Sequence, residues 1–254
     1  MLIYIHTAGR PDKQTTLKSF SPELIKRTRL VVQDAEKDRY YKFPNVVVLP
    51  GDIDRLSPTR QWILENAESN KFVMMDDDLT FAFRTFFSGT KLHKAELDNV
   101  AVMFHEIETA LDHHIHVGVS AREGNNRVKA DFKEIARMMR LLAYDKQKVL
   151  DTGAKFDRID TKQDFDMTLQ LLRKGYKNLV FYKYAHNQSG SNARGGCSVY
   201  RNPEMMDRCS NELAALHPDF VKVVEKYTKT SWGGGIRTDV RIAWKKAYES
   251  YTQS

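Results

Sequence analysis

The sequence predicts an α/β fold in which helices flank a mostly parallel central sheet. Short apolar runs recur between polar segments in the first eighty residues, and segments with helical periodicity lie between and after them. A strand that is buried on both faces reads as a continuous apolar run, which is typical of parallel sheets. The 254 residues suffice for one large domain. We expect a catalytic domain over residues 1–200 and a helical extension over 201–254 that packs on it.

Four apolar runs are the expected strands of the N-terminal part. They are Leu2–His6, Leu30–Gln33, Val46–Leu49 and Phe72–Met75. Before the last of them, Ser57 and Pro58 open a capped helix that continues through Thr59–Ala67. Open α/β sheets bind ligands beyond the carboxyl ends of their strands, and polar residues follow several of these strands.

The pattern of helix and strand continues in the second half. Lys94–Leu111 carries apolar residues three and four positions apart, which predicts a long helix packed on the sheet. His116–Ser120 and Leu179–Tyr184 read as strands. Between them, Asp164–Lys174 reads as a second amphipathic helix that ends at Gly175, a typical C-cap.

The C-terminal part has less regular patterns. His186–Gly196 is rich in Gly, Ser and Asn, so we expect a mobile loop there. From Pro203 onward we expect helices, interrupted by the WGGG run at Trp232–Gly235.

The charge balance favours a polyanionic partner. Lys and Arg outnumber Asp and Glu by 40 to 33, for a net charge of +7. Because many acidic residues cluster in candidate sites, the remaining surface is more basic than this total, which favours nucleic acid. A single substrate diphosphate would also account for part of the excess. No run approaches the roughly 18 apolar residues of a membrane span, and two cysteines give no disulfide framework. We see no signal peptide and expect a cytoplasmic protein without a membrane partner.

Three adjacent carboxylates, Asp76, Asp77 and Asp78, follow the apolar run FVMM. At a buried strand end they repel one another unless a cation or several donors neutralise them. Alternate residues of an extended segment point the same way, so Asp76 and Asp78 would address one site while Asp77 turns aside. Such oxygen ligands suit Mg²⁺ or Mn²⁺, which completes its shell with waters and substrate phosphates. The alternative is a solvated acidic loop.

Two further acidic residues, Asp164 and Asp166, stand in the first turn of the helix in QDFDMTLQLLRKGY. Both positions favour an anion through the helix dipole, so capping alone would explain them. Alternatively one of them, preferably Asp164, faces the pocket and takes the proton of an acceptor hydroxyl. His186, after the last strand, is either a metal ligand or a hydrogen-bonded surface histidine.

A donor nucleotide would be held at the ends of the first two strands and on the helix before the triple aspartate. The candidates are Thr7, Ala8, Gly9, Arg10, Asp34 and Arg60. The small-residue turn lets backbone approach a nucleotide and lets Arg10 reach a phosphate. A surface turn for Asp34 and a solvated helix position for Arg60 are the alternatives.

Taken together, these segments resemble the GT-A glycosyltransferases. The resemblance rests on TAGR after the first strand, SPTRQWILENA before FVMMDDD, and QDFDMTLQLLRKGY followed by a histidine, and it covers Leu2 to Gly196. GT-A enzymes usually carry Glu-Asp before this helix, whereas this chain has Gln163-Asp164, which leaves the identity of the base open.

The resemblance implies a role for each matching residue. Asp76 would contact the donor ribose or a metal, with Asp77 also on the donor side, and Asp78 and His186 would bind the metal. Asp164 would act at the acceptor, with Asp166 as the second acidic residue of that helix. The implied cofactor is Mn²⁺ or Mg²⁺, and the implied donor is a nucleoside diphosphate sugar, with a UDP-sugar expected.

More narrowly, the compact length, the basic surplus and the QDFDM and HNQSG…GG patterns resemble the small phage glycosyltransferases associated with TET/JBP base oxygenases. This implies transfer of a hexose or pentose to a 5-hydroxymethylated pyrimidine, such as 5-hydroxymethylcytosine, in phage DNA. The alternatives are a GT-A enzyme acting on protein, lipid or polysaccharide, and an inactive module that binds sugar nucleotides or nucleic acid. A sugar-nucleotide pyrophosphorylase would need a glycine-rich phosphate loop, which TAGRPDKQ supplies poorly.

Overall fold

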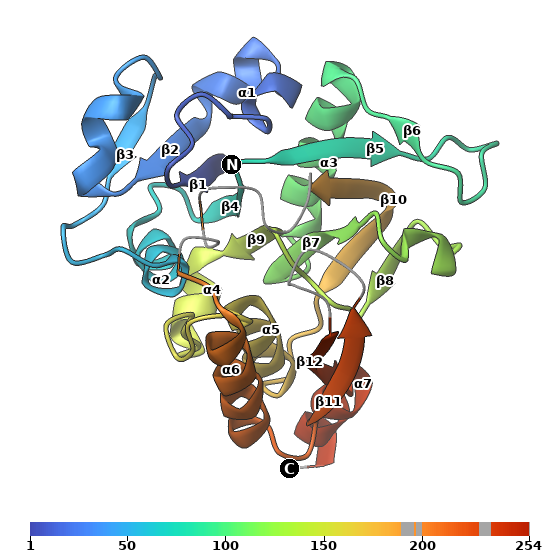
Figure 1. Ribbon diagram of the computed structural model, residues 1–254. Helices are drawn as coiled ribbons and strands as arrows, with labels where there is room; N and C mark the ends of the chain where they lie inside the picture. The colour runs from blue at the N-terminus through green and yellow to red at the C-terminus, as the bar shows by residue number, and fades with distance from the viewer. Residues whose placement is uncertain (189–195, 197–199, 229–234, 254) are drawn as a thin grey trace.

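The computed structural model describes residues 1–188, 196, 200–228 and 235–253 (Figure 1). Its strands are β1 (Leu2–Thr7), β2 (Thr28–Val32), β3 (Val46–Val48), β4 (Lys71–Asp76), β5 (Leu79–Phe83), β6 (His93–Lys94), β7 (His116–Ala121), β8 (Phe132–Glu134), β9 (Leu141–Asp145), β10 (Leu179–Gln188), β11 (Val221–Thr228) and β12 (Gly235–Ile242). Its helices are α1 (Pro22–Lys26), α2 (Leu56–Asn66), α3 (Leu97–Ala110), α4 (Lys146–Asp151), α5 (Gln163–Leu172), α6 (Pro203–Leu216) and α7 (Trp244–Glu249). Most of the expected loop between residues 186 and 196, and Trp232 with its neighbouring glycines at 233 and 234, lie outside the described residues.

A mixed sheet forms the centre of the molecule. Within the described residues its strand order is β3-β2-β1-β4-β9-β7-β10-β5-β6, and β8 pairs with β10. The four strands from β3 to β4 are parallel, as are β7 and β10. β9 runs antiparallel between β4 and β7, and β5 runs antiparallel to β10. The predicted α/β class is therefore confirmed, with antiparallel strands added to its second half.

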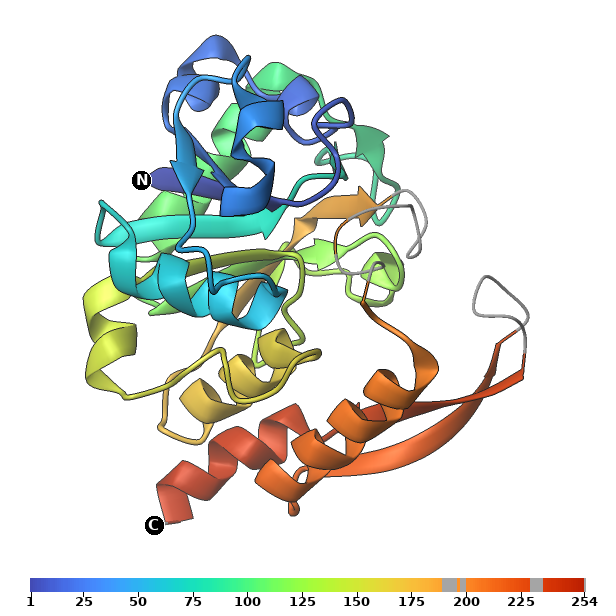
Figure 2. The ribbon, with the colours of Figure 1, turned by 60° about the vertical axis from the view of Figure 1, so that its left-hand side comes forward.

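Helices cover both faces of this sheet, because its strands are apolar on both sides. In β1, Ile3 and Ile5 belong to the buried cluster under α3, whereas Tyr4 belongs to the cluster under α2 and α5. This alternation follows from the two-residue period of a strand. Figure 2 shows the helices on the two faces.

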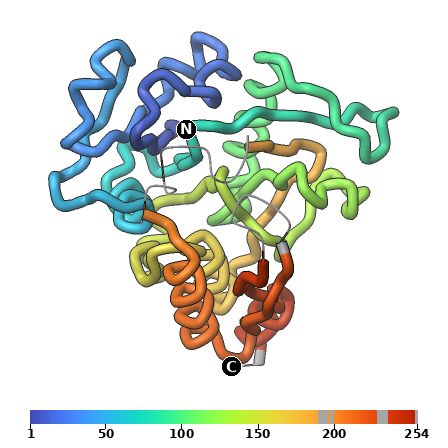
Figure 3. The backbone as a smooth tube through the Cα atoms, in the orientation of Figure 1, coloured from blue at the N-terminus to red at the C-terminus, as the bar shows by residue number. Residues whose placement is uncertain are grey.

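The C-terminal extension contains an unpredicted sheet. Helices α6 and α7 occur as expected, but between them β11 and β12 form an antiparallel hairpin. The run VKVVEKYT explains the difference, because its β-branched residues favour a strand over a helix. A third buried cluster joins α5 to this extension through residues such as Leu169, Leu213 and Ala247. Figure 3 traces this last part of the chain, orange to red, below the sheet.

Parallel pairing places two predicted segments at one edge of the sheet. His6 of β1 lies opposite Asp76 of β4 in the ladder. The end of β1 with the residues after it, Thr7 to Arg10, and the residues after β4, Asp77 and Asp78, therefore emerge side by side. None of the described helices has the length and apolarity needed to cross a bilayer.

Candidate functional site

A cavity of about 840 Å³ is lined by residues at the carboxyl ends of β1 and β4 and by residues of the C-terminal extension. The sheet side contributes Thr7 to Arg10, Arg60, the three aspartates and Asp164. The extension contributes residues at the start of α6 and on β12. The structure thus brings most of the predicted site residues to one space.

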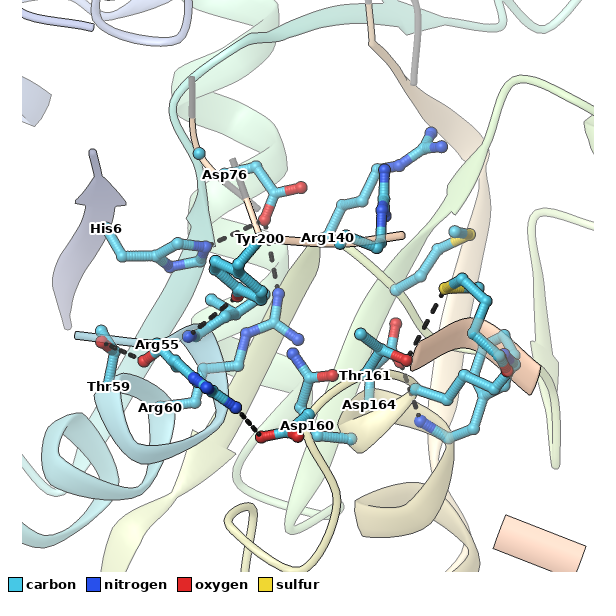
Figure 4. A pocket seen from close by; sticks show the side chains of 18 of the residues that line it. His6, Arg55, Thr59, Arg60, Asp76, Arg140, Asp160, Thr161, Asp164 and Tyr200 are labelled. Carbon is cyan, nitrogen blue, oxygen red and sulfur yellow. Dashed lines mark hydrogen bonds and ion pairs between the residues drawn. The ribbon is translucent and has the colours of Figure 1, made fainter. Parts of the chain in front are cut away.

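Asp76 lines this cavity, where a histidine and an arginine contact its carboxylate (Figure 4). Its Oδ1 lies 3.1 Å from His6 Nε2 and 3.3 Å from Arg60 Nη2. Burial alone would raise the pKa of Asp76, but the His6 hydrogen bond and the charges of Arg60 and Arg140 outweigh it and lower the pKa to about 2. Asp76 is therefore an anion over the whole physiological pH range.

Asp77 and Asp78 share one guanidinium. Arg10 Nη1 donates to Asp77 Oδ1 and to Asp78 Oδ2, at 2.9 Å in each case. Thr7 Oγ1 donates to the other oxygen of Asp77, and Gln188 donates to Asp78 Oδ2. Burial nevertheless raises the pKa of both carboxyl groups. Asp78 Oδ1 is buried without a hydrogen-bond partner among the described residues.

Asp164 lies across Arg60 from Asp76 (Figure 4). Burial raises the pKa of this carboxyl group, the charges of Arg60 and Arg137 lower it, and Asp76 raises it again, so that the net shift is upward. Its Oδ1 accepts a hydrogen bond from the Phe165 amide at 3.0 Å. A carboxylate with a raised pKa in a cavity is suited to proton transfer.

Asp166, two residues further along α5, points elsewhere. It does not line the cavity and is fully buried, with Oδ1 2.7 Å from His217 Nε2. Gln170 donates to its second oxygen at 2.9 Å, and Arg158 lies 3.5 Å away. The position of Asp166 therefore does not support the sequence hypothesis that it is a catalytic residue. Its contact with His217 instead links α5 to the end of α6.

Asp34 also lies outside the cavity. Its side chain is exposed and pairs with Lys37 at 2.9 Å. The neighbouring Gln33 and Glu36 line the cavity in its place, because the chain turns into a 3₁₀ helix directly after β2. This position matches the surface-turn alternative for Asp34.

His186 is buried in β10 and does not line the cavity. Neither ring nitrogen has a partner at hydrogen-bonding geometry among the described residues, although the Met139 backbone slightly favours the charged ring. Burial and the charge of Arg140 lower its pKa to about 3, against the opposing effect of Asp76. The ring is therefore neutral near pH 7 and close enough to Asp76 to sense its charge. Whether it ligates a metal stays a prediction.

Several cationic side chains in the cavity had no signal in the sequence patterns, among them Arg140 and Lys162. Arg140 and Lys162 both line it, and both have a left-handed backbone with φ of 63°. This conformation is uncommon for residues other than glycine and clusters at functional sites. Arg140 Nη1 is buried without a hydrogen bond among the described residues, and the Glu123 carboxylate is 3.9 Å away. Arg140 thus adds a positive charge to the cavity lining, where it helps to lower the pKa of Asp76.

The opposite pKa shifts of neighbouring aspartates predict distinct titrations. We expect Asp76 to stay ionised until about pH 2, whereas Asp77 and Asp78 take up protons above their ordinary pKa of 3.8. Because the folded-state pKa of Asp76 is depressed, its contribution to stability is present above about pH 4 and is lost as the pH falls toward 2. Carbon-13 NMR of the carboxyl groups measures each titration. His6→Ala should raise the Asp76 pKa, and an unchanged value would contradict this account.

The sequence is similar to a known protein family and to individual phage proteins. The sequence model of the TET-Associated Glycosyltransferase family matches residues 1–196, most of the chain. The Beta-glucosyl-HMC-alpha-glucosyl-transferase of Enterobacteria phage T2 is 22% identical over 208 residues, covering 75% of this chain and 72% of the phage protein. The protein of that name from Enterobacteria phage T6 is 22% identical, covering 79% and 74%.

Solved structures resemble this chain at low sequence identity. The protein described as a mycobacterial protein has a TM-score of 0.52 and 10% identity, and the match covers 98% of this chain and 87% of that one. TarS of S. aureus in complex with UDP-GlcNAc has a TM-score of 0.49 and 15% identity, covering 84% and 67%.

Proposed function

The chain belongs to the TET-associated glycosyltransferase family, and we propose that it transfers a sugar from a nucleoside diphosphate to a 5-hydroxymethylated pyrimidine in DNA. The family makes it a glycosyltransferase. The phage relatives, named for glucosyl transfer involving HMC, support the choice of acceptor. A UDP-sugar is the expected donor.

One observation carries this proposal. A single cavity contains the acidic pair Asp76 and Asp78 at the end of β4 and, across Arg60, the separate carboxyl group of Asp164, whose pKa is raised. A glycosyltransferase needs one set of side chains that binds the donor diphosphate and another that acts on the acceptor hydroxyl. The cavity volume of about 840 Å³ is within the usual range for small-molecule sites, roughly 300 to 1,000 Å³.

The residues present fit a divalent cation at Asp76 and Asp78. Both carboxylates line the cavity, and the buried, unpartnered Oδ1 of Asp78 lacks the donor that such an atom normally has. The described residues contain no group of three acidic, histidine or cysteine side chains placed around one ion. Two carboxylates are nevertheless typical for Mg²⁺ or Mn²⁺, whose other ligands come from water and substrate phosphates. When bound, the metal would supply charge neutralisation at the donor diphosphate.

The chain's own residues perform the remaining tasks. Arg10 and Arg140 would attract the diphosphate oxygens, because guanidinium groups match phosphate geometry. Asp164 would accept the proton of the acceptor hydroxyl if the anomeric centre is inverted, or would orient the acceptor if it is retained. Arg60 lies between Asp76 and Asp164. It would hold Asp76 through their hydrogen bond and would offset part of the negative charge of Asp164.

Removing one metal ligand tests the cation assignment. We expect Asp78→Asn to lower Mn²⁺-dependent transfer by about a hundredfold to a thousandfold, because several kcal/mol of charge stabilisation are lost. Radiolabelled sugar transfer, with and without EDTA, measures this. Asp12→Asn is the matched control, since Asp12 is exposed and pairs only with Lys42 among the described residues. Full activity of Asp78→Asn, or of the wild type in EDTA, would contradict the metal assignment.

The proposed function is tested in two steps, first by identifying the donor and then by identifying the acceptor. A thermal-shift screen of UDP-, GDP- and ADP-sugars with Mn²⁺ should single out one donor, since ligand at 100 times Kd stabilises the fold by about 2.7 kcal/mol. That donor is then offered to DNA containing 5-hydroxymethylcytosine and to unmodified DNA. Sugar on the modified DNA alone is the expected result, and transfer to neither DNA would reject the proposed acceptor.

A further inference from the structure

The β11–β12 hairpin carries cations in an arrangement that opposes its own stability. Its register places Lys222 directly opposite Arg241 and Lys226 directly opposite Arg237. Positions two apart on a strand share a face, so all four cations lie on the same face of the hairpin. Like charges directly opposite each other destabilise a strand pair.

Only one of these pairs is compensated within the described residues. Asp239, on the same face, lies 2.7 Å from Lys226 and 3.7 Å from Arg237. Neither Lys222 nor Arg241 forms a salt bridge with any carboxylate in the described part of the chain, and both are exposed. Local rules that a protein violates without internal compensation are expected at functional sites. An external anion would relieve this repulsion.

The cationic face borders the donor cavity. Lys226, Arg237 and Arg241 all line it, as do Asp76, Asp77 and Asp78. Thr238, Val240 and Ile242 of the other face line the cavity as well, and near the base of the hairpin that face packs on α6 and α7 through Val221 and Ile242. An anion held on the cationic face would sit beside the reacting groups.

The hairpin also exposes an apolar pair toward its distal end. Tyr227 and Ile236 lie opposite each other and are 72% and 71% exposed. Each follows or precedes a cation by one residue and therefore lies on the other face of the hairpin, so this pair takes no part in the cationic face. The two cation pairs are four residues apart, about 13 Å, which matches about four base pairs of duplex. A two-stranded ribbon also fits the major groove.

We infer that the cationic face of the β11–β12 hairpin binds the phosphates of acceptor DNA and presents the target base to the donor cavity. This inference rests on the proposed function for its choice of acceptor. The residues involved lie beyond the 1–196 segment that the family model matches. A membrane surface would meet the same cations, so it is an outcome to be distinguished by the test.

The test is the salt dependence of DNA binding by Lys222→Ala/Arg241→Ala. Each lost phosphate contact removes about 0.9 from the slope of log affinity against log salt, so the double variant should be shallower by about 1.8. Lys26→Ala/Lys37→Ala is the matched control, because it removes the same charge from exposed positions on other elements. Removing the opposed cations should not lower the melting temperature, so a folding defect is not expected to obscure the result.

The outcomes separate this inference from the proposed function. Transfer of sugar to hydroxymethylated DNA by the wild type reports on the function, whereas the slope reports on the hairpin. A wild-type slope in the hairpin variant, alongside wild-type transfer to DNA, would overturn the inference and leave the function standing. Binding to vesicles of anionic lipid, lost in the hairpin variant while DNA affinity stays unchanged, would also overturn it.

Discussion

Replacing Asp166 with alanine should destabilise the protein by about 1 to 3 kcal/mol, the range typical when a buried polar group loses its hydrogen-bond partner. Asp166 and His217 are both fully buried and 2.7 Å apart, and Gln170 and Arg158 also address the carboxylate. Without the carboxylate, Nε2 of the buried His217 would lose its hydrogen-bond partner. Urea denaturation followed by circular dichroism measures the change in free energy of unfolding.

Two controls make this result specific. Asp207→Ala removes an exposed aspartate from α6 and should change the free energy of unfolding by less than about 0.5 kcal/mol. His217→Ala should also destabilise the protein, and the double variant should cost less than the sum because the two residues interact. Additive effects, or an Asp166 variant as stable as the wild type, would show that this contact does not anchor α6.

The architecture around the site was predictable because it follows from local patterns. Continuous apolar runs marked β1, β2, β3 and β4, and helical periodicity marked α2, α3 and α5. Since parallel strands end at one edge, Thr7, Arg10 and Asp78 were expected near one another. The cavity contains them.

What the sequence did not reveal depends on contacts between distant segments. Asp164 and Asp166 have the same helix-start signal, and only the packing of α6 on α5 separates the cavity residue from the buried anchor. Arg140 has no periodic or motif signal, because its left-handed backbone follows from the turn into β9. The β11–β12 hairpin could have been found from the β-branched residues of VKVVEKYT, but its like-charge pairs require the register.

Asp164→Asn should lower the rate of sugar transfer by about a hundredfold to ten-thousandfold, the usual contribution of a positioned base. The amide keeps the shape of the side chain but cannot take a proton from the acceptor. Because burial raises the Asp164 pKa, ionising this group works against folding, so the variant should be at least as stable as the wild type. Single-turnover transfer to hydroxymethylated DNA across pH 5 to 9 measures the rate, and urea denaturation measures stability.

Variants of the two aspartates of α5 are therefore expected to have opposite phenotypes. Asp164→Asn should remove transfer while donor binding, read by thermal shift, and the fold persist. Asp166→Ala should weaken the fold, and at temperatures where the variant remains folded its Asp164, Asp76 and Asp78 still line the cavity, so transfer should continue. If Asp164→Asn transferred sugar at the wild-type rate while Asp166→Ala was folded but inactive, the catalytic carboxylate would be Asp166, and the cavity described above would not be where the acceptor reacts.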